Sequence, residues 1–153
     1  MDGVQGGGLV KKALTALLLI GAASALAHLH VTAQSYYPVV RVSSPDGVVF
    51  TAVHEPTSER GECAAANERF LAPFKSMCSD CRVVAARCER ELQGVEAALN
   101  DGKSIPHHRI FAPGVQVSIA GPEGAASSSC HQIAANGSAQ GVRCIPPSRP
   151  DKS

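Results

Sequence analysis

The segment Glu62–Cys88 reads ECAAANERFLAPFKSMCSDCRVVAARC. In its first half, apolar residues recur every three or four positions, which is the spacing of one face of a helix. Arg82–Cys88 follows a polar turn and is rich in valine and alanine, so we expect a short strand there. Pro73 predicts a kinked last turn or an early end of the helix. The face that this helix should bury consists of Cys63, Ala66, Phe70, Phe74 and Met77.

Strand and helix patterns continue on both sides of this segment. On its N-terminal side, residues 39–42 and 48–53 are β-branched runs around the turn sequence Ser44-Pro45-Asp46-Gly47. They predict two strands, the first of them at an edge of the sheet. On the C-terminal side we expect a short helix with Leu92, Val95 and Leu99, a β-hairpin or one long bulged strand over 109–119, a helix over 122–136 and a last strand over 142–145.

The order of these elements predicts the fold. From Val48 onward it is strand, helix, strand, short helix, strand, helix, strand. This order matches a ferredoxin-like (split βαβ) α+β sandwich with an extra helix and an added N-terminal strand. We therefore expect a disulfide-linked α+β domain at 47–146, a spacer and edge strand at 28–46, and a disordered tail at 147–153.

The predicted topology brings the six cysteines together in pairs. In each pair, one cysteine lies on or at the end of a helix, and the other lies on the strand that follows it at a similar height. The expected pairs are Cys63–Cys88, Cys78–Cys81 and Cys130–Cys144. In the chain-entropy model, each of the two bridges that close longer loops contributes about 3 kcal/mol to the stability of a small domain.

Residues 1–27 are typical of a secretory signal. Lys11-Lys12 precede an apolar run, and Ser24-Ala25-Leu26-Ala27 supplies an A-x-A cleavage site. Left uncleaved, the same segment would extend to about residue 33 as a signal anchor. Both alternatives place Lys11 and Lys12 on the cytoplasmic side and the body outside. The protein is therefore expected to be periplasmic or secreted, or to be a single-pass membrane protein with a cytoplasmic N-terminus. Its cysteines would then meet an oxidising compartment, in which disulfides persist.

The Cys78–Cys81 pair has the CxxC spacing of a redox dithiol. Oxidoreductase pairs of this kind lie at a helix N-terminus, whose positive end stabilises the thiolate. Here the pair follows the C-terminus of the predicted helix, and Asp80 adds a negative charge, so thiol-redox activity is an alternative and not the first expectation. A zinc site formed by Cys63, Cys78, Cys81 and Cys88 is a further alternative, although only its CxxC half resembles a zinc knuckle.

Histidines offer a second class of candidate site. Cleavage after Ala27 would expose His28-Leu29-His30 as a new N-terminus. A free amine, the amides that follow it and an imidazole at the third position suit Cu(II) or Ni(II), so His28 and His30 are candidate copper ligands. His54, His107 and His108 lie on or beside predicted strands, and we expect them to be ordinary half-exposed side chains.

Composition limits the functions that remain. The formal net charge is +1, aromatic residues make up 4% of the chain, and tryptophan is absent. Without a basic stripe, nucleic acid is a poor candidate partner. No linear catalytic motif is present either, although catalytic groups need not form one, so an enzymatic role stays open but is not favoured. We expect an exported, non-catalytic cell-envelope binding module, without a resident cofactor, for an envelope protein or small ligand; the alternative is an exported thiol-redox or copper-binding protein.

Overall fold

The computed structural model describes residues 35–148. The predicted signal or anchor segment, with His28 and His30, and the tail from residue 149 lie outside the described residues. Within the described part, no helix is both long enough and apolar enough to span a bilayer. The strands are β1 (Tyr37–Ser43), β2 (Val49–His54), β3 (Arg82–Glu89), β4 (His108–Ala112), β5 (Val115–Ala120) and β6 (Arg143–Ile145). The helices are α2 (Arg60–Met77), α3 (Gly94–Asn100) and α4 (Glu123–Asn136), and a 3-10 turn follows α4 at Ser138–Gln140.

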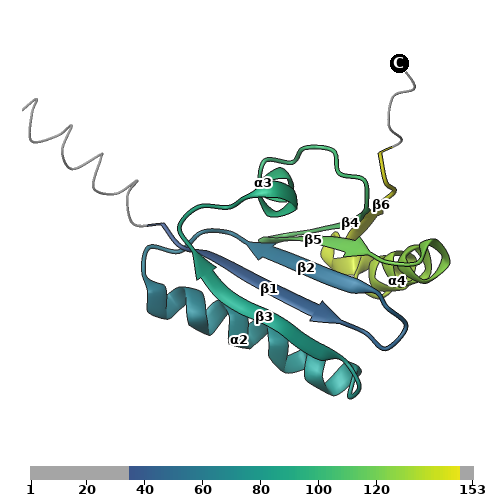
Figure 1. Ribbon diagram of the computed structural model, residues 1–153, viewed down its shortest axis with the longest axis horizontal. Helices are drawn as coiled ribbons and strands as arrows, with labels where there is room; N and C mark the ends of the chain where they lie inside the picture. The colour runs from purple at the N-terminus through teal and green to yellow at the C-terminus, as the bar shows by residue number, and fades with distance from the viewer. Residues whose placement is uncertain (1–34, 149–153) are drawn as a thin grey trace, which may run out of the picture. The chain divides into compact units, whose positions relative to one another are not determined.

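The six strands form one antiparallel sheet in the order β3-β1-β2-β5-β4-β6 (Figure 1). This order contains two ββαβ units. The first unit is β1-β2-α2-β3 and the second is β4-β5-α4-β6. In each, the first two strands form a hairpin, a helix follows, and the last strand pairs with the first. The units join through β2 and β5, so the sheet repeats the same arrangement from either edge.

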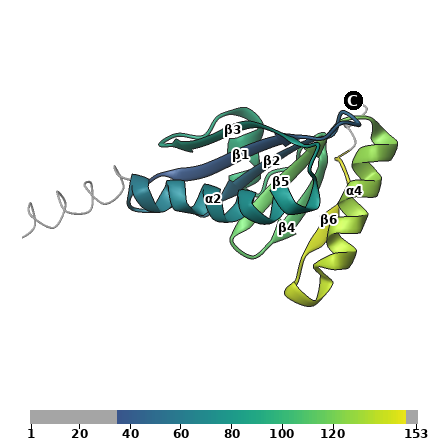
Figure 2. The same ribbon diagram turned by 90° about the horizontal axis from the view of Figure 1, so that it is seen from below.

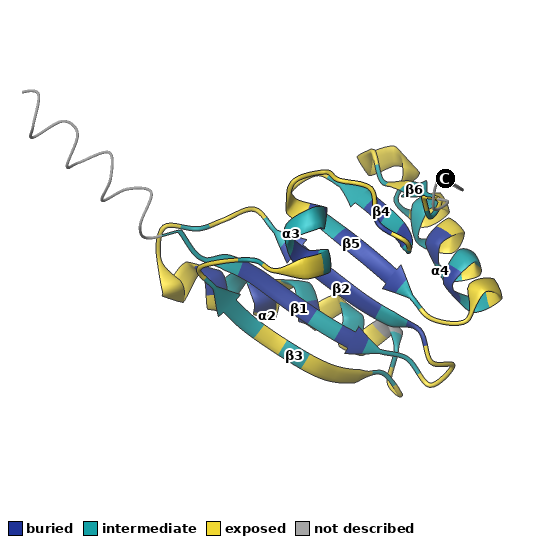
Figure 3. Cartoon of the chain, turned by 45° about the horizontal axis from the view of Figure 1, so that its top comes forward, coloured by how far each residue is buried: buried dark blue, intermediate teal, exposed yellow. Residues whose placement is uncertain are grey.

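The helices cover the two faces of the sheet unequally. α2 packs on β1 and β3, and α4 packs on β4, β5 and β6 (Figure 2). Since successive side chains of a strand point to opposite faces, Val40 and Val42 enter the core beneath α2 and α4, whereas Val39 packs beneath α3. Figure 3 shows that β1 and β2 are largely buried, whereas the edge strand β3 has only exposed and intermediate residues.

The ferredoxin-like arrangement is not confirmed. Each unit does contain a split βαβ element, because α2 joins the parallel strands β2 and β3 with β1 between them, and α4 joins β5 and β6 around β4. The segment predicted as a hairpin or one long strand is the hairpin β4–β5, which supplies the second unit with its inserted strand, β4. In the first unit the inserted strand is β1. The expectation that the first strand lies at an edge is wrong, since β1 bonds to β2 and β3.

The prediction that Pro73 ends the first helix early is also wrong, whereas a kink at Pro73 stays a prediction. α2 continues through Pro73 to Met77. A proline within a helix removes one backbone N–H and leaves the carbonyl four residues earlier without its partner. Here Arg69 and Pro73 both lie on the exposed side of α2, where water can bond that carbonyl. The Ser76 hydroxyl also donates to the Pro73 carbonyl oxygen at 2.8 Å.

Candidate functional site

The six cysteines form three disulfides. The distances between the paired Cα atoms are 6.0 Å for Cys63–Cys88, 5.3 Å for Cys78–Cys81 and 5.4 Å for Cys130–Cys144. These are the three predicted pairs, and no free cysteine is left. Three disulfides in one small domain are typical of proteins from an oxidising, extracytoplasmic compartment.

The four-cysteine zinc site is contradicted. Cys63 lies in the first turn of α2 and Cys78 directly follows its last residue. Fifteen residues of helix separate them by about 22 Å, at a rise of about 1.5 Å per residue. The sulfurs of Cys63 and Cys78 therefore belong to bridges at opposite ends of the helix and cannot share one metal ion.

A cavity of about 330 Å³ lies between the C-terminal end of α2 and α4. We call it the interhelix cavity. Its apolar lining includes Phe50 of β2, Phe74 of α2 and Ile133 of α4, and the Cys78–Cys81 disulfide contributes to its wall. Polar side chains complete the lining: Ser44, Asp46, Ser129, Gln132 and Asn136. The site thus combines a concave apolar surface with a few polar groups, which is the usual composition of a ligand site.

Aromatic packing holds one wall of the interhelix cavity in place. The rings of Phe50 and Phe74 meet edge to face, with their centroids 5.6 Å apart. Phe74 also lies 5.9 Å from Phe70, which contacts the His54 ring at 5.0 Å. This row of rings joins β2 to α2 and places Phe74 in the wall of the interhelix cavity.

The polar lining of the interhelix cavity carries a negative charge. The Ser44 hydroxyl donates a hydrogen bond to the Asp46 carboxylate within the β1–β2 turn. An aspartate is ionised at neutral pH, and this hydrogen bond lowers the pKa of the Asp46 carboxyl further. A ligand with an apolar group and a cationic or hydrogen-bond-donating end matches this distribution.

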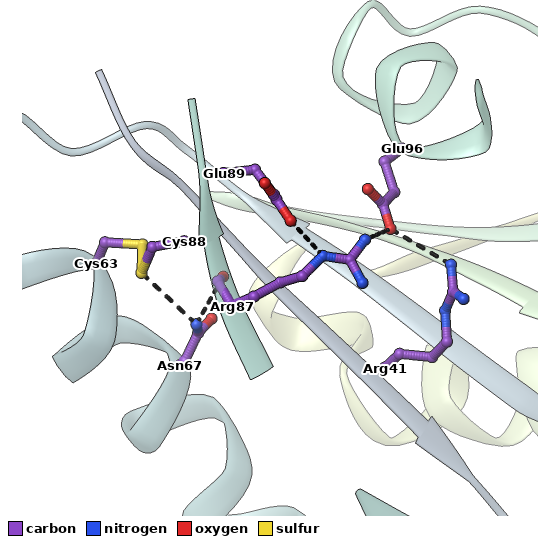
Figure 4. A network of polar contacts seen from close by, with 7 residues as sticks. All are labelled: Arg41, Cys63, Asn67, Arg87, Cys88, Glu89 and Glu96. Atoms are coloured by element: carbon purple, nitrogen blue, oxygen red, sulfur yellow. Dashed lines mark hydrogen bonds and ion pairs between the residues drawn. A yellow bond between two sulfur atoms is a disulfide. The ribbon is translucent and has the colours of Figure 1, made fainter. Parts of the chain in front are cut away.

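A polar network on the opposite face is structural. Glu96 of α3 is almost fully buried and receives Arg87 Nη2 at 2.6 Å and Arg41 Nη2 at 3.3 Å (Figure 4). Arg87 Nε also lies 2.6 Å from a Glu89 carboxylate oxygen. Beside it, the Asn67 amide donates to the Arg87 carbonyl at 3.0 Å. These contacts tie α3 and α2 to β1 and β3. Each charged side chain in the network is paired with another one, so we interpret the network as structural.

The histidines within residues 35–148 do not gather into one site. His54 ends β2, where burial and then the charge of Arg69 lower the pKa of its imidazole. His108 lies elsewhere in the sheet, paired with Ile119, and its side chain is buried and not half-exposed as expected. The reason is that α4 begins above it, with a Glu123 carboxylate oxygen 3.2 Å from His108 Nε2.

The interhelix cavity itself was not predicted from the sequence. Its lining comes from the β1–β2 turn, from β2, from the end of α2 and from α4, which are far apart in the chain. Comparisons with protein-family models, with curated proteins and with solved structures each find no match for this chain.

Proposed function

We propose that this protein is an exported, non-catalytic binding module whose ligand site is the interhelix cavity. The observation that carries the proposal is a concave apolar surface that has fixed aromatic walls and one ionised carboxylate among its lining residues. Its volume is at the small end of the range for ligand pockets, so it suits one apolar side chain of an envelope protein or a small ligand.

Export is supported by the three disulfides and by the leader-like segment at 1–27. We propose cleavage after Ala27, with retention as an anchor to about residue 33 as the alternative. N-terminal sequencing of the protein recovered from outside the cytoplasm distinguishes the two. Recovery of the full chain from the cytosol with all thiols open to alkylation would contradict export.

Binding can be tested with phenethylammonium, which carries an aromatic ring and a cation. We expect its NMR chemical-shift changes to map to the lining of the interhelix cavity. Ser129→Trp should fill the cavity and abolish those changes. Ser128→Trp is the matched control, because Ser128 is exposed on the same helix and does not line the cavity. Shifts elsewhere, or equal effects of both variants, would remove the interhelix cavity as the site.

The carboxylate has a separate test. Asp46→Asn should weaken phenethylammonium binding about two- to fivefold, because an exposed ion pair contributes little. Binding of benzyl alcohol, which has the ring without the charge, should stay unchanged. Equal losses for both probes would show that Asp46 shapes the site and does not recognise charge.

Thiol-redox activity remains the second candidate, because the Cys78–Cys81 disulfide lines the interhelix cavity. A redox pair would be reduced selectively under mild conditions, whereas a structural bridge would resist. Counting free thiols against reductant concentration separates these outcomes. Copper binding stays a prediction, since His28 and His30 lie outside the described residues; Cu(II) titration of the mature protein with a free or blocked N-terminal amine tests it.

A further inference from the structure

The second ββαβ unit contains a compact cluster of metal-ligand residue types. His108 of β4, Cys130 of α4 and Cys144 of β6 each place one ligand atom within 4.8 Å of the others. Cys130 is completely buried and His108 is 5% exposed. In the structure the two sulfurs are bonded to each other. The cluster is separate from the interhelix cavity, since none of these three residues lines it.

The histidine in this cluster has a carboxylate partner on one ring nitrogen, as a zinc-bound histidine usually has. Its Nε2 lies 3.2 Å from the Glu123 carboxylate. Its Nδ1 is buried and has no hydrogen-bond partner among residues 35–148. Zinc-bound histidines typically give one ring nitrogen to the metal and donate the other N–H to a carboxylate, which fixes the tautomer. Glu123 supplies that carboxylate and leaves Nδ1 available.

We propose that reduction of the Cys130–Cys144 disulfide opens a zinc site formed by the two thiolates and His108 Nδ1, with water as the fourth ligand. A dithiol reductant supplies two electrons and two protons, the S–S bond breaks into two thiols, and the reductant becomes a disulfide. Zn²⁺ then displaces both thiol protons. Two Cys ligands, one His and water are an established zinc ligand set.

The position of β6 in the sheet allows the two sulfurs to separate after reduction. Tetrahedral zinc with Zn–S bonds of about 2.3 Å holds its two thiolate sulfurs about 3.8 Å apart. Among the described strands, β6 is hydrogen-bonded only to β4, because it lies at the edge of the sheet. It can therefore move outward without breaking hydrogen bonds to a second strand. The same two cysteines would therefore hold β6 to α4 in either redox state.

The first unit has no equivalent site. Its helix-to-strand disulfide, Cys63–Cys88, is accompanied by the amide of Asn67, whose nitrogen lies 3.9 Å from Cys88 Sγ. An amide nitrogen does not bind zinc in place of an imidazole. The inference is therefore specific to the cluster of the second unit.

The test uses the full chain, reduced with a dithiol that is then removed without air. Titration with Co²⁺ reports tetrahedral thiolate coordination by its absorption, and competition with Zn²⁺ gives the affinity. We expect the reduced protein to bind metal at this site and the oxidised protein not to bind it. The Cys130→Ser/Cys144→Ser variant should lose one metal equivalent, whereas Cys78→Ser/Cys81→Ser should keep it. The reverse pattern would overturn the proposal.

Single variants keep the test independent of whether the double variants fold. His108→Gln and Glu123→Gln retain all three disulfides during purification and are reduced afterwards. We expect His108→Gln to change the Co²⁺ spectrum and to lower zinc affinity by tenfold or more, and Glu123→Gln to lower it about tenfold. His131→Gln is the control, because His131 is exposed beside Cys130 in the sequence and lies outside the cluster. Unchanged affinity in His108→Gln would exclude the site.

Discussion

The two ββαβ units share one topology and differ in how their last strands are held. In the first unit, β3 has eight residues and pairs with β1 along most of its length. In the second unit, β6 has three residues and pairs with β4 at three positions. Both are edge strands, and in both a disulfide joins the strand to the helix of its own unit. In each unit the cross-link therefore gives the edge strand, which has a sheet neighbour on one side only, a second attachment to its unit.

Removing the two long disulfides compares these cross-links directly. In the chain-entropy model, losing Cys63–Cys88 costs about 3.5 kcal/mol and losing Cys130–Cys144 about 3 kcal/mol, because the first closes the longer loop. We expect paired Cys→Ala variants to follow this order in urea unfolding. A larger loss for Cys130–Cys144 would break the comparison, since it would mean that the short β6 depends on its bridge more than loop length predicts.

The junction between the units rests on a close backbone approach at Gly121. This residue follows β5 with φ of +147°, and an added Cβ would lie 2.8 Å from the Gly47 carbonyl oxygen in the β1–β2 turn. Gly121→Ala should therefore destabilise the protein by about 2 kcal/mol, because both the strain and the clash involve backbone. Gly124→Ala is the control: nothing lies within 4 Å of its added Cβ, and alanine favours α4. Equal melting temperatures for both variants would contradict this role of Gly121.

The Glu96 network distinguishes the first unit, because it joins α3, which packs on β2 and β5, to Arg41 of β1 and Arg87 of β3. Glu96→Gln should cost about 1–2 kcal/mol, since it leaves two arginines without their buried carboxylate and both arginines keep some access to water. Glu89→Gln removes an ion pair whose two side chains are both more than a third exposed, so it should cost less than about 1 kcal/mol. Chemical denaturation of the two variants measures the difference. Equal costs would mean that Glu96 is not the residue that holds α3.

The sequence predicts contacts between consecutive elements better than contacts between elements that are far apart in the chain. The Cys63–Cys88 and Cys130–Cys144 pairs were predicted although the strand order was not. Each pair needs only a helix packed against the strand that follows it. This local geometry is the same in the predicted ferredoxin-like topology and in the observed one. The position of β1 between β2 and β3 depends instead on which strands find each other across the sheet, and no local pattern specifies that choice.

The same reasoning applies to the candidate site. The CxxC pair was identified from its spacing, but the interhelix cavity beside it needs Phe50, Phe74 and Ile133 from three separate elements. The sequence predicts for His108, beside a predicted strand, an ordinary half-exposed side chain. Its burial depends on the start of α4, which packs over β4 and brings Glu123 next to His108. The two residues are 15 positions apart, so no local pattern predicts this contact.

The smallest expected difference between the units is in pH dependence. Of the two central strands, β2 ends in a titratable residue, His54, whereas β5 carries none. Burial, followed by the nearby charge of Arg69, lowers the pKa of His54 below its ordinary value of 6.5. Above that value the imidazole is neutral in the folded and unfolded chains, so it does not affect stability. As the pH falls below 6.5, the unfolded chain takes up a proton that the folded chain resists, and stability is lost until the pH passes below the folded pKa. Asp46 and Asp101, whose pKa values are also lowered, lose their contributions to stability only at more acidic pH.

We therefore expect the unfolding midpoint to fall between about pH 7.5 and pH 5. His54→Phe should reduce that fall, and His131→Phe, at an exposed position in the second unit, should leave it unchanged. If the two variants kept the same pH profile as the unaltered chain, the acid sensitivity would have to come from groups outside the contact between β2 and α2.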